Sequence, residues 1–414
     1  MIDKILEFFK TPTLVGKVNR KLYGEVLTPI SLVNEMLDGL PSEVWCNPSL
    51  TWLDPANGRG VFPAVVLQRL MIGLEQWQAD EEKRYKHIME KMIYVCELQP
   101  ENVVEYVNIF DPQGKYKFNT FTGSFLTPEF DQHSQEIWGV EKFDVIVGNP
   151  PYQLQKEGFK KTQPLWDKFV TQSLKTLTLN GYLCMVHPSG WRNIGGIFTQ
   201  IKESILERNL LHLKIRSAQE GLRRFGAATR FDFYTLENKK PNGKTEITFQ
   251  DGVTKTIDLK KLQLIPNEQI ERVMTLLNGN QKIIYSRSLY GSDKKHMSKE
   301  KTGEFKFPCA YYTGAKNRID LLYSSKKSEH FGEPKVIITQ NVWGGRAFPD
   351  PNGEFGLTQF VFGISCQPED ANDIALAINS TSFRDIICKL HMSKCGYEKA
   401  IFSLLNKDFW KEFI

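Results

Sequence analysis

The first 240 residues alternate short apolar runs with amphipathic stretches. Apolar runs of the length expected for buried strands occur at residues 50–54, 91–97, 143–149, 181–188 and 230–237. Residues 61–74 and 165–177 instead carry apolar positions at helical spacing. Strands that alternate with helices in this way are typical of an α/β domain with a mostly parallel sheet.

The pattern becomes irregular beyond residue 240, where Gly- and Lys-rich connections separate the apolar stretches. A chain of 414 residues also exceeds what one hydrophobic core of ordinary size accommodates. We therefore predict two domains, residues 1–240 and residues 241–414, with the boundary in the polar stretch ENKKPNGK.

The composition narrows the class of protein. Hydrophobic residues make up 41% of the chain and charged residues 24%, which is typical of a soluble globular protein. No apolar run is long enough to span a membrane, and the N-terminus lacks the apolar core of a signal peptide. The seven cysteines stand singly, so neither a metal site nor a disulfide framework is expected. These features favour a cytoplasmic protein with reduced thiols.

The formal net charge of +5 permits a nucleic-acid partner without requiring one. Basic clusters nevertheless gather in the second half of the chain, at residues 238–244, 259–263, 292–301 and 324–330. Aromatic residues such as Tyr311, Tyr312 and Trp343 are interleaved with them, and this combination favours nucleic-acid binding. For any single cluster, a solvated loop is the alternative.

A glycine-containing turn, LDPANGRGVF, follows the first apolar run. Asp54 ends the predicted strand, and Gly58 and Gly60 precede a predicted helix. Glycine permits positive φ and close approach of a ligand to the backbone, and a helix N-terminus presents N–H groups to anionic ligand atoms. The turn therefore suits a nucleoside-bearing cofactor, although it is neither a GxGxxG fingerprint nor a P-loop. An ordinary strand-to-helix turn is the alternative.

Glu97 ends the next apolar strand, MIYVCE. A carboxylate in this position can accept hydrogen bonds from the two hydroxyls of a ribose. Taken alone, Glu97 could equally be a surface carboxylate. Its position at the end of the strand that follows the glycine-containing turn supports the cofactor interpretation.

The stretch DVIVGNPPY places Asn149, Pro150, Pro151 and Tyr152 at the end of another predicted strand. The two prolines stiffen the loop. An amide oxygen and a backbone carbonyl can together bind the two N–H donors of an exocyclic amine, while an aromatic ring stacks on the base that carries it. A rigid turn with a buried tyrosine is the alternative.

Two further features accompany these motifs. Thr28 and Pro29 precede a helical pattern, and Pro29 stands where a helix N-terminus is expected. Phe225 is an aromatic residue just before a late predicted strand. A simple helix start and core packing are the respective alternatives.

In this order the motifs resemble the gamma group of amino-methyltransferases that act on adenine in DNA, in the manner of restriction-modification methylases. The resemblance covers roughly residues 20–240 and rests on the Thr-Pro segment, the DPANGRGVF turn, the strand-end acid and NPPY. It implies a Rossmann-like methyltransferase domain with a mixed, mostly parallel sheet over residues 1–240. An α+β target-recognition domain would then occupy residues 241–414.

The resemblance also implies roles for individual residues. S-adenosyl-L-methionine would be bound by Thr28, Pro29, Asp54, Pro55, Asn57, Gly58, Gly60, Phe62, Glu97 and Asn149. Asn149 and Pro150 would hold the adenine amino group within the Asn149–Tyr152 loop, which includes Pro151. Tyr152 would stack on the flipped base, with Phe225 against its other side or edge.

The chain departs from the family pattern at two positions. Asn57 replaces the usual cysteine, and Ser124 stands where an acid often contacts the adenine of the cofactor. Either Ser124 or a backbone group would then make that contact, or the affinity for the cofactor would be weaker.

The implied partner is double-stranded DNA. A separate cognate restriction nuclease is a second possible partner, and neither membrane binding nor a metal ion is expected. Residues whose side chains could read bases or contact phosphates in the second half are Gln340, Arg346, Lys394 and Lys399. Two alternatives remain from the sequence alone. One is methylation of a protein glutamine or an RNA amine, and the other is a catalytically silent DNA-binding subunit.

Overall fold

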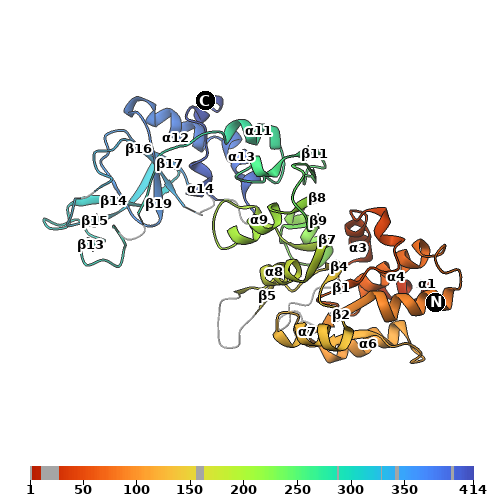
Figure 1. Cartoon of the computed structure of the whole chain (residues 1–414). Coiled ribbons are helices and arrows are strands. Elements are labelled where there is room, and N and C mark those ends of the chain that lie inside the picture. The colour runs from red at the N-terminus through yellow and green to blue at the C-terminus, as the bar shows by residue number, and fades with distance from the viewer. Residues whose placement is uncertain are drawn as a thin grey trace. The chain divides into compact units, whose positions relative to one another are not determined.

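The computed structural model describes residues 2–10, 28–154, 163–286, 289–327, 329–340, 345–392 and 396–414. The chain forms two compact units (Figure 1). The first comprises Met1–Trp191 and Ile197–Gln263, and the second comprises Arg192–Gly196 and Leu264–Ile414. In the described parts of the chain, no helix combines the length and apolar character that crossing a membrane requires.

The first unit is built on one nine-stranded sheet in the order β11-β10-β8-β9-β7-β4-β1-β2-β3. The strands are β1 (Trp52–Asp54), β2 (Ile93–Glu97), β3 (Asn119–Thr122), β4 (Phe143–Gly148), β7 (Leu177–Pro188), β8 (Asn209–Arg216), β9 (Phe231–Glu237), β10 (Thr245–Thr248) and β11 (Thr254–Ile257). Strands β7, β4, β1, β2 and β3 run parallel, whereas β9 is antiparallel to both of its neighbours. The mixed, mostly parallel sheet is confirmed.

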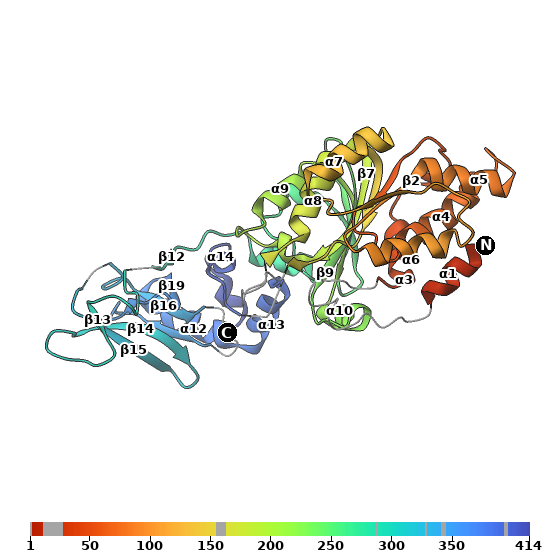
Figure 2. The ribbon, with the colours of Figure 1, turned by 90° about the horizontal axis from the view of Figure 1, so that it is seen from below.

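Helices cover both faces of this sheet (Figure 2). They are α1 (Ile2–Lys10), α3 (Ile30–Leu37), α4 (Val61–Gly73), α5 (Glu81–His87), α6 (Pro100–Phe110), α7 (Pro128–His133), α8 (Trp166–Thr176), α9 (Thr199–Leu206) and α10 (Ala218–Phe225). Side chains of α1, α3, α4 and α6 form one core with Val145 and Val147 of β4, which share a face because side chains alternate along a strand. Strands β5 (Gln153–Leu154) and β6 (Gln163–Pro164) pair in antiparallel orientation.

The first unit extends beyond residue 240, where the sequence placed the domain boundary. Strand β10 pairs in parallel with β8, and β11 pairs with β10, so residues up to Gln263 belong to the sheet-bearing unit. The assignment of methyl transfer to residues 1–240 and of target recognition to residues 241–414 stays a prediction.

The second unit contains two four-stranded sheets and short helices, which is the α+β character expected of it. One sheet has the order β12 (Ile283–Ile284), β19 (Val361–Ser365), β16 (Lys335–Thr339), β17 (Ala347–Asp350). The other has the order β13 (Met297–Ser298), β15 (Arg318–Ser324), β14 (Phe307–Gly314), β18 (Gly356–Leu357). The helices are α11 (Ile270–Leu276), α12 (Ala371–Asn379), α13 (Thr381–Leu390) and α14 (Lys399–Phe402).

The thiols differ in one respect from the sequence expectation. Free cysteines are found at Cys46, Cys96, Cys184, Cys309 and Cys366. Cys388, on α13, is instead disulfide-bonded. The expectation of reduced thiols without any disulfide is therefore wrong for Cys388, because a disulfide depends on how closely the fold brings two thiols together, which cysteine spacing in the sequence does not show.

Candidate active site

The carboxyl ends of four adjacent parallel strands converge at one edge of the large sheet. In the order β4-β1-β2-β3, these strands end at Gly148, Asp54, Glu97 and Thr122, and the loops that follow carry the sequence motifs. Ligands of open α/β sheets bind beyond the carboxyl ends of the strands. The topology thus brings together motifs that lie far apart in the sequence.

The turn after β1 is held by its own hydrogen bonds. Ala56 N donates to Asp54 Oδ1 at 3.1 Å, and Gly60 N donates to Asn57 O at 3.0 Å. Asn57 N donates to Cys96 O at 3.0 Å, which ties the turn to the neighbouring strand β2. The turn is therefore a fixed platform rather than a loose loop.

The two glycines of the turn have different surroundings. Gly60 precedes α4 with φ 100°, and a Cβ there would lie 2.6 Å from Tyr106 Cδ2. Gly58 has φ 54°, and a Cβ there would meet no atom within 4 Å. Close packing against α6 thus requires glycine at position 60, while Gly58 opens onto empty space.

Glu97 connects β2 to this turn. Its Oε2 accepts a hydrogen bond from Gly58 N at 2.7 Å. Its Oε1 accepts from Gln99 N at 2.9 Å and from Asn102 Nδ2 at 3.4 Å. These bonds fix the orientation of the Glu97 carboxylate at the end of β2.

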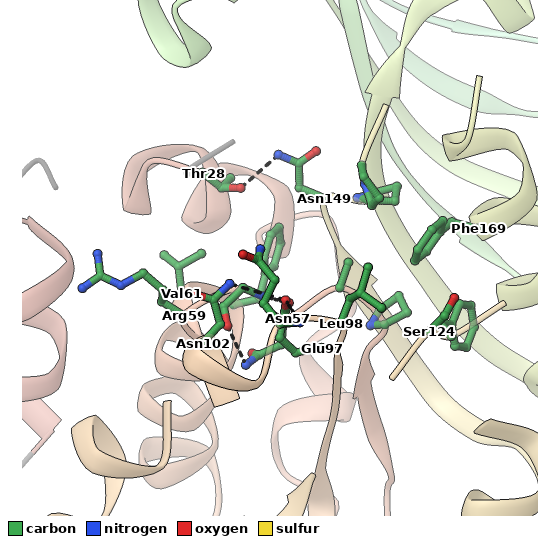
Figure 3. A pocket seen from close by; sticks show the side chains of 18 of the residues that line it. Thr28, Asn57, Arg59, Val61, Glu97, Leu98, Asn102, Ser124, Asn149 and Phe169 are labelled. Carbon is green, nitrogen blue, oxygen red and sulfur yellow. Dashed lines mark hydrogen bonds between the residues drawn. The ribbon is translucent and has the colours of Figure 1, made fainter. Parts of the chain in front are cut away.

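The NPPY loop is fixed to the start of the first unit through Asn149. Asn149 Nδ2 donates to Thr28 Oγ1 at 3.0 Å (Figure 3). The other amide atom, Asn149 Oδ1, is buried and has no hydrogen-bond partner in the described ranges. Because buried polar atoms are normally hydrogen-bonded, an acceptor without a partner marks a place where a ligand donor would fit.

The ring of Tyr152 packs against Phe225 at the end of α10. The ring centroids lie 6.4 Å apart with an interplanar angle of 81°, an edge-to-face arrangement. Phe225 is buried and also packs against Phe231 of β9. Burial raises the pKa of the Tyr152 phenol, and the nearby Asp232 carboxylate raises it further, so the hydroxyl stays protonated.

A cavity of about 260 Å³ lies between these loops. The predicted site residues that line it are Thr28, Pro55, Asn57, Gly58, Phe62, Glu97, Ser124, Asn149, Pro150, Pro151 and Tyr152. Pro29, Asp54, Gly60 and Phe225 do not line it. Pro29 caps α3, and Asp54 lies buried beneath the turn, so these residues support the site from behind.

Sequence reasoning missed several apolar residues that line the same cavity. These are Phe9 of α1, Leu98 after β2, Phe169 of α8, and Phe125, Leu126 and Leu165. Leu98 is 54% exposed, which is unusual for a leucine beside a buried strand. That feature of the sequence, an apolar residue directly after the strand-end acid, could have indicated an apolar wall.

The Asp54 carboxyl group has a strongly raised pKa. Burial raises its pKa to about 8, the hydrogen bond from Ala56 N opposes that effect, and the negative charge of Glu97 adds to it. Its Oδ2 atom has no hydrogen-bond partner among the residues that the structure describes. Below pH 8 the protonated form of Asp54 is therefore favoured in the folded protein.

Ser124 lies on the cavity wall after β3. Its Oγ accepts a hydrogen bond from Leu126 N at 3.2 Å and keeps its hydroxyl hydrogen for another acceptor. The structure is thus compatible with the contact expected of Ser124, which stays a prediction.

Three of the four expected DNA-contacting side chains are engaged within the second unit. Gln340 Nε2 donates to the carbonyls of Gln359 and Val361 at 3.4 and 3.5 Å. Arg346 Nη1 donates to Asn379 O at 2.8 Å, and Lys399 Nζ lies 3.7 Å from the ring centroid of Tyr285. The fourth, Lys394, lies outside the described residues.

Comparison with known proteins agrees with this geometry. Residues 33–220 match the family model described as Eco57I restriction-modification methylase. An adenine-specific methylase of Mycoplasma pneumoniae, itself uncharacterised, is 25% identical, and the alignment covers 64% of this chain and 78% of the relative.

Two solved structures are among the matches. The type IIL restriction-modification enzyme MmeI in complex with DNA has a TM-score of 0.52 at 11% identity, covering 94% of this chain and 69% of that one. The EcoKI M protein of a type I restriction enzyme has a TM-score of 0.38 at 15% identity, covering 53% of this chain. The present chain spans about half the length of such type I proteins. The segment that matches the restriction-modification methylase model contains the turn after β1, Glu97 and the NPPY loop.

Proposed function

We propose that this protein transfers a methyl group from S-adenosyl-L-methionine to the N6 amino group of adenine in a specific sequence of double-stranded DNA. The base would be flipped out of the duplex, and the amino nitrogen would attack the methyl group directly and in line. The N–C bond would form as the bond between carbon and sulfur breaks, and the methylated nitrogen would then release one proton to water. The observation that carries the proposal is the buried Oδ1 of Asn149, which has no hydrogen-bond partner among the described residues and lines the same cavity as Tyr152.

The residues of the cavity fit S-adenosyl-L-methionine. The Glu97 carboxylate, fixed by Gly58 N and Gln99 N, is suited to the ribose hydroxyls. The apolar side chains of Leu98 and Phe169 are suited to the two faces of an adenine ring. Asn57 Oδ1, buried and without a hydrogen-bond partner in the described ranges, is an acceptor for a donor at the amino-acid end.

To methylate an exocyclic amine, the protein needs hydrogen-bond acceptors for the amino group and must position that group against the methyl donor. When bound, S-adenosyl-L-methionine supplies an electrophilic methyl group. The lone pair of the adenine amino nitrogen is delocalised into the ring, and acceptors at Asn149 Oδ1 and the Pro150 carbonyl would favour its localisation on nitrogen. The same acceptors would stabilise the positive charge that develops on nitrogen in the transition state. Tyr152 would hold the flipped base by stacking, and this can offset about 1–3 kcal/mol of the unstacking cost.

The comparisons support the choice of substrate. The matched family is a restriction-modification methylase, and the Mycoplasma relative is named for adenine. MmeI was solved in complex with DNA and resembles this chain over most of its length. Double-stranded DNA in the cytoplasm is accordingly the proposed partner, and a separate restriction nuclease is a second candidate partner.

The decisive experiment is methylation of a long DNA of defined sequence, with the modified adenines mapped by position. We expect methylation confined to adenines in one sequence context for the wild-type protein. Asn149→Ala should lower the single-turnover rate by on the order of 10²–10³, because it removes one transition-state acceptor. RNA and protein substrates are assayed in parallel, and methylation of one of them instead of DNA would support an RNA amine or a protein glutamine as the methyl acceptor. Cofactor binding without methylation of any substrate would instead support a silent DNA-binding subunit.

A further inference from the structure

Strands β14 (Phe307–Gly314) and β15 (Arg318–Ser324) form an antiparallel ribbon in the second unit. The turn that joins them contains Lys316 and Asn317, both with positive φ, at 57° and 53°. All residues of the turn are exposed, and five consecutive residues of β15 are only half-buried. Strand β15 is thus partly accessible along most of its length and the turn is fully accessible, whereas half of β14 is buried.

Positive charge is concentrated around this ribbon. Residues 291–330 contain nine lysines and arginines against five aspartates and glutamates, so this segment carries most of the formal net charge of +5 of the whole chain. No ion pair within the described ranges involves Lys294, Lys295, Lys299, Lys301, Lys316, Lys326 or Lys327. Cations without acidic partners are available to an anionic partner.

The one arginine of the ribbon is held in a defined orientation. Arg318 Nε donates to Asp320 Oδ1 and Arg318 Nη2 to Asp320 Oδ2, both at 2.9 Å. The two residues share a face because they are two positions apart on one strand. Across the ribbon Arg318 pairs with Gly314, which has no side chain to cover it.

This bidentate contact uses only one edge of the guanidinium group. Of the remaining donors, one hydrogen of Nη1 and one of Nη2 point in the same direction and form a second edge, at the end of the guanidinium group. That edge matches the O6 and N7 acceptors of guanine in the major groove, which also has the width to admit a two-stranded ribbon.

We propose that the β14–β15 ribbon enters the major groove of duplex DNA, with Arg318 reading a guanine and the surrounding lysines contacting phosphates. Asp320 acts as a positioning residue that fixes the orientation of the guanidinium group. The proposal rests on the proposed function and names the recognition surface for it. Duplex DNA is the occupant that this surface favours, because the lysines flank a ribbon with a pre-oriented base-reading side chain.

Three variants test the reading of guanine. The sequence that the wild-type protein methylates is determined first. Each variant is then assayed on DNAs that differ from this sequence at one base pair. Arg318→Ala should lower discrimination at one G·C pair by roughly 5- to 150-fold, the range expected for one bidentate contact. Arg318→Lys keeps the charge but loses the planar fork, so it should lose discrimination nearly as far while retaining DNA affinity. As a control, Arg272→Ala removes an exposed arginine of α11 in the same unit. This variant should change neither the discrimination at the G·C pair nor the DNA affinity.

A second measurement tests the phosphate contacts. Replacing Lys316, Lys326 and Lys327 by alanine should reduce the slope of log affinity against log salt by about one for each lost contact. Lys407→Ala, an exposed lysine elsewhere in this unit, serves as the control.

The outcomes separate this proposal from the one it rests on. A wild-type protein that methylates a site without any G·C pair, or an Arg318→Lys variant with unchanged discrimination, overturns the ribbon proposal alone. A wild-type protein that binds the cofactor but methylates no DNA overturns the proposed function. If the lysine variants lose affinity for anionic vesicles rather than for DNA, the surface is a membrane site and the ribbon proposal is wrong.

Discussion

Asn149 Nδ2 donates a hydrogen bond to Thr28 Oγ1 at 3.0 Å, across 121 positions of sequence. The bond fixes which end of the amide faces Thr28 and directs Oδ1 the other way. Since Oδ1 is the acceptor proposed for the adenine amino group, Thr28 controls the catalytic orientation without contacting the base.

Replacing Thr28 by valine tests this relationship. Valine has nearly the shape of threonine but cannot accept a hydrogen bond, so the amide of Asn149 becomes free to turn. We expect the single-turnover rate of methylation to fall by roughly two- to twelvefold, the value of one ordinary hydrogen bond. DNA affinity should not change. Thr28→Ser restores the hydroxyl and should restore the rate, whereas equal rates for valine and threonine would contradict the orienting role.

Asp54 should make the stability of the first unit depend on pH. Its pKa is about 8 in the folded protein, well above its ordinary value of 3.8, because of burial. Between these two values the folded state holds a proton that the unfolded state has released. The free energy of unfolding should therefore decrease as pH rises from about 4 to about 8, by up to about 1.4 kcal/mol per pH unit from this group.

The matched variant for this prediction is Asp54→Asn, which keeps an acceptor for Ala56 N but cannot ionise. Denaturation midpoints measured at several pH values should show the variant gaining stability relative to the wild type as pH rises. Above about pH 8 the difference should level off. Parallel curves for the two proteins would contradict a raised pKa.

The two glycines of the turn should respond differently to alanine. Gly60→Ala forces a Cβ to 2.6 Å from Tyr106 and a positive φ of 100°, so it should lower the free energy of unfolding by more than about 2 kcal/mol. Gly58→Ala at φ 54° should cost about 1 kcal/mol and instead weaken cofactor affinity, because the added methyl enters the cavity. Thermal unfolding and cofactor titration on both variants check the contrast. Equal losses of stability would contradict it.

The sequence predicted the parts of the site that depend on local chemistry. The sequence predicted the residues at the strand ends and the start of α4 at Val61. Buried strands appear in the sequence as short apolar runs, and the turn before α4 is marked by its glycines. The orienting bond between Thr28 and Asn149 was not predicted, since it depends on how strands and loops meet in space.

Other features lay beyond the sequence for the same reason. Gln340 and Arg346 have side chains that could read bases, but their observed partners are backbone carbonyls brought close by β17, β19 and α12. Phe9 and Phe169 reach the cavity from helices that carry no motif. The strand pairing of β10 with β8 extended the first unit because parallel pairing leaves no turn signal in the sequence.

Glu35 of α3 should stabilise the position of α10, the helix that carries Phe225. Its carboxylate pairs with Arg216 of β8 and, at 3.1 Å, with Arg224 of α10, and these side chains are only 15–23% exposed. We expect Glu35→Ala to lower the free energy of unfolding by about 1–3 kcal/mol, since it removes an acidic partner of both arginines, which then retain their ion pairs with Glu220. Glu43→Ala, an exposed acid without an ion pair in the described residues, is the control for denaturant titration. Equal midpoints for the two variants would contradict the role.

The role of Tyr152 can be divided between its ring and its hydroxyl. The hydroxyl oxygen is buried and has no hydrogen-bond partner within the described ranges. Tyr152→Phe removes this atom and keeps the ring, so stability should be unchanged or slightly raised and methylation should stay within about threefold of the wild type.

Tyr152→Ala removes the ring as well, and with it the stacking that holds the extruded base. A loss of about 1–3 kcal/mol of stacking should weaken capture of the base roughly 5- to 150-fold. A fluorescent base analogue at the target adenine reports this step separately from chemistry. With Asn149→Ala the analogue should still brighten on binding, because the base still leaves the stack while methyl transfer slows. With Tyr152→Ala the signal should change because the stacking partner is gone. If Tyr152→Phe loses as much activity as Tyr152→Ala, the hydroxyl rather than the ring acts on the base, and stacking is not the function of Tyr152.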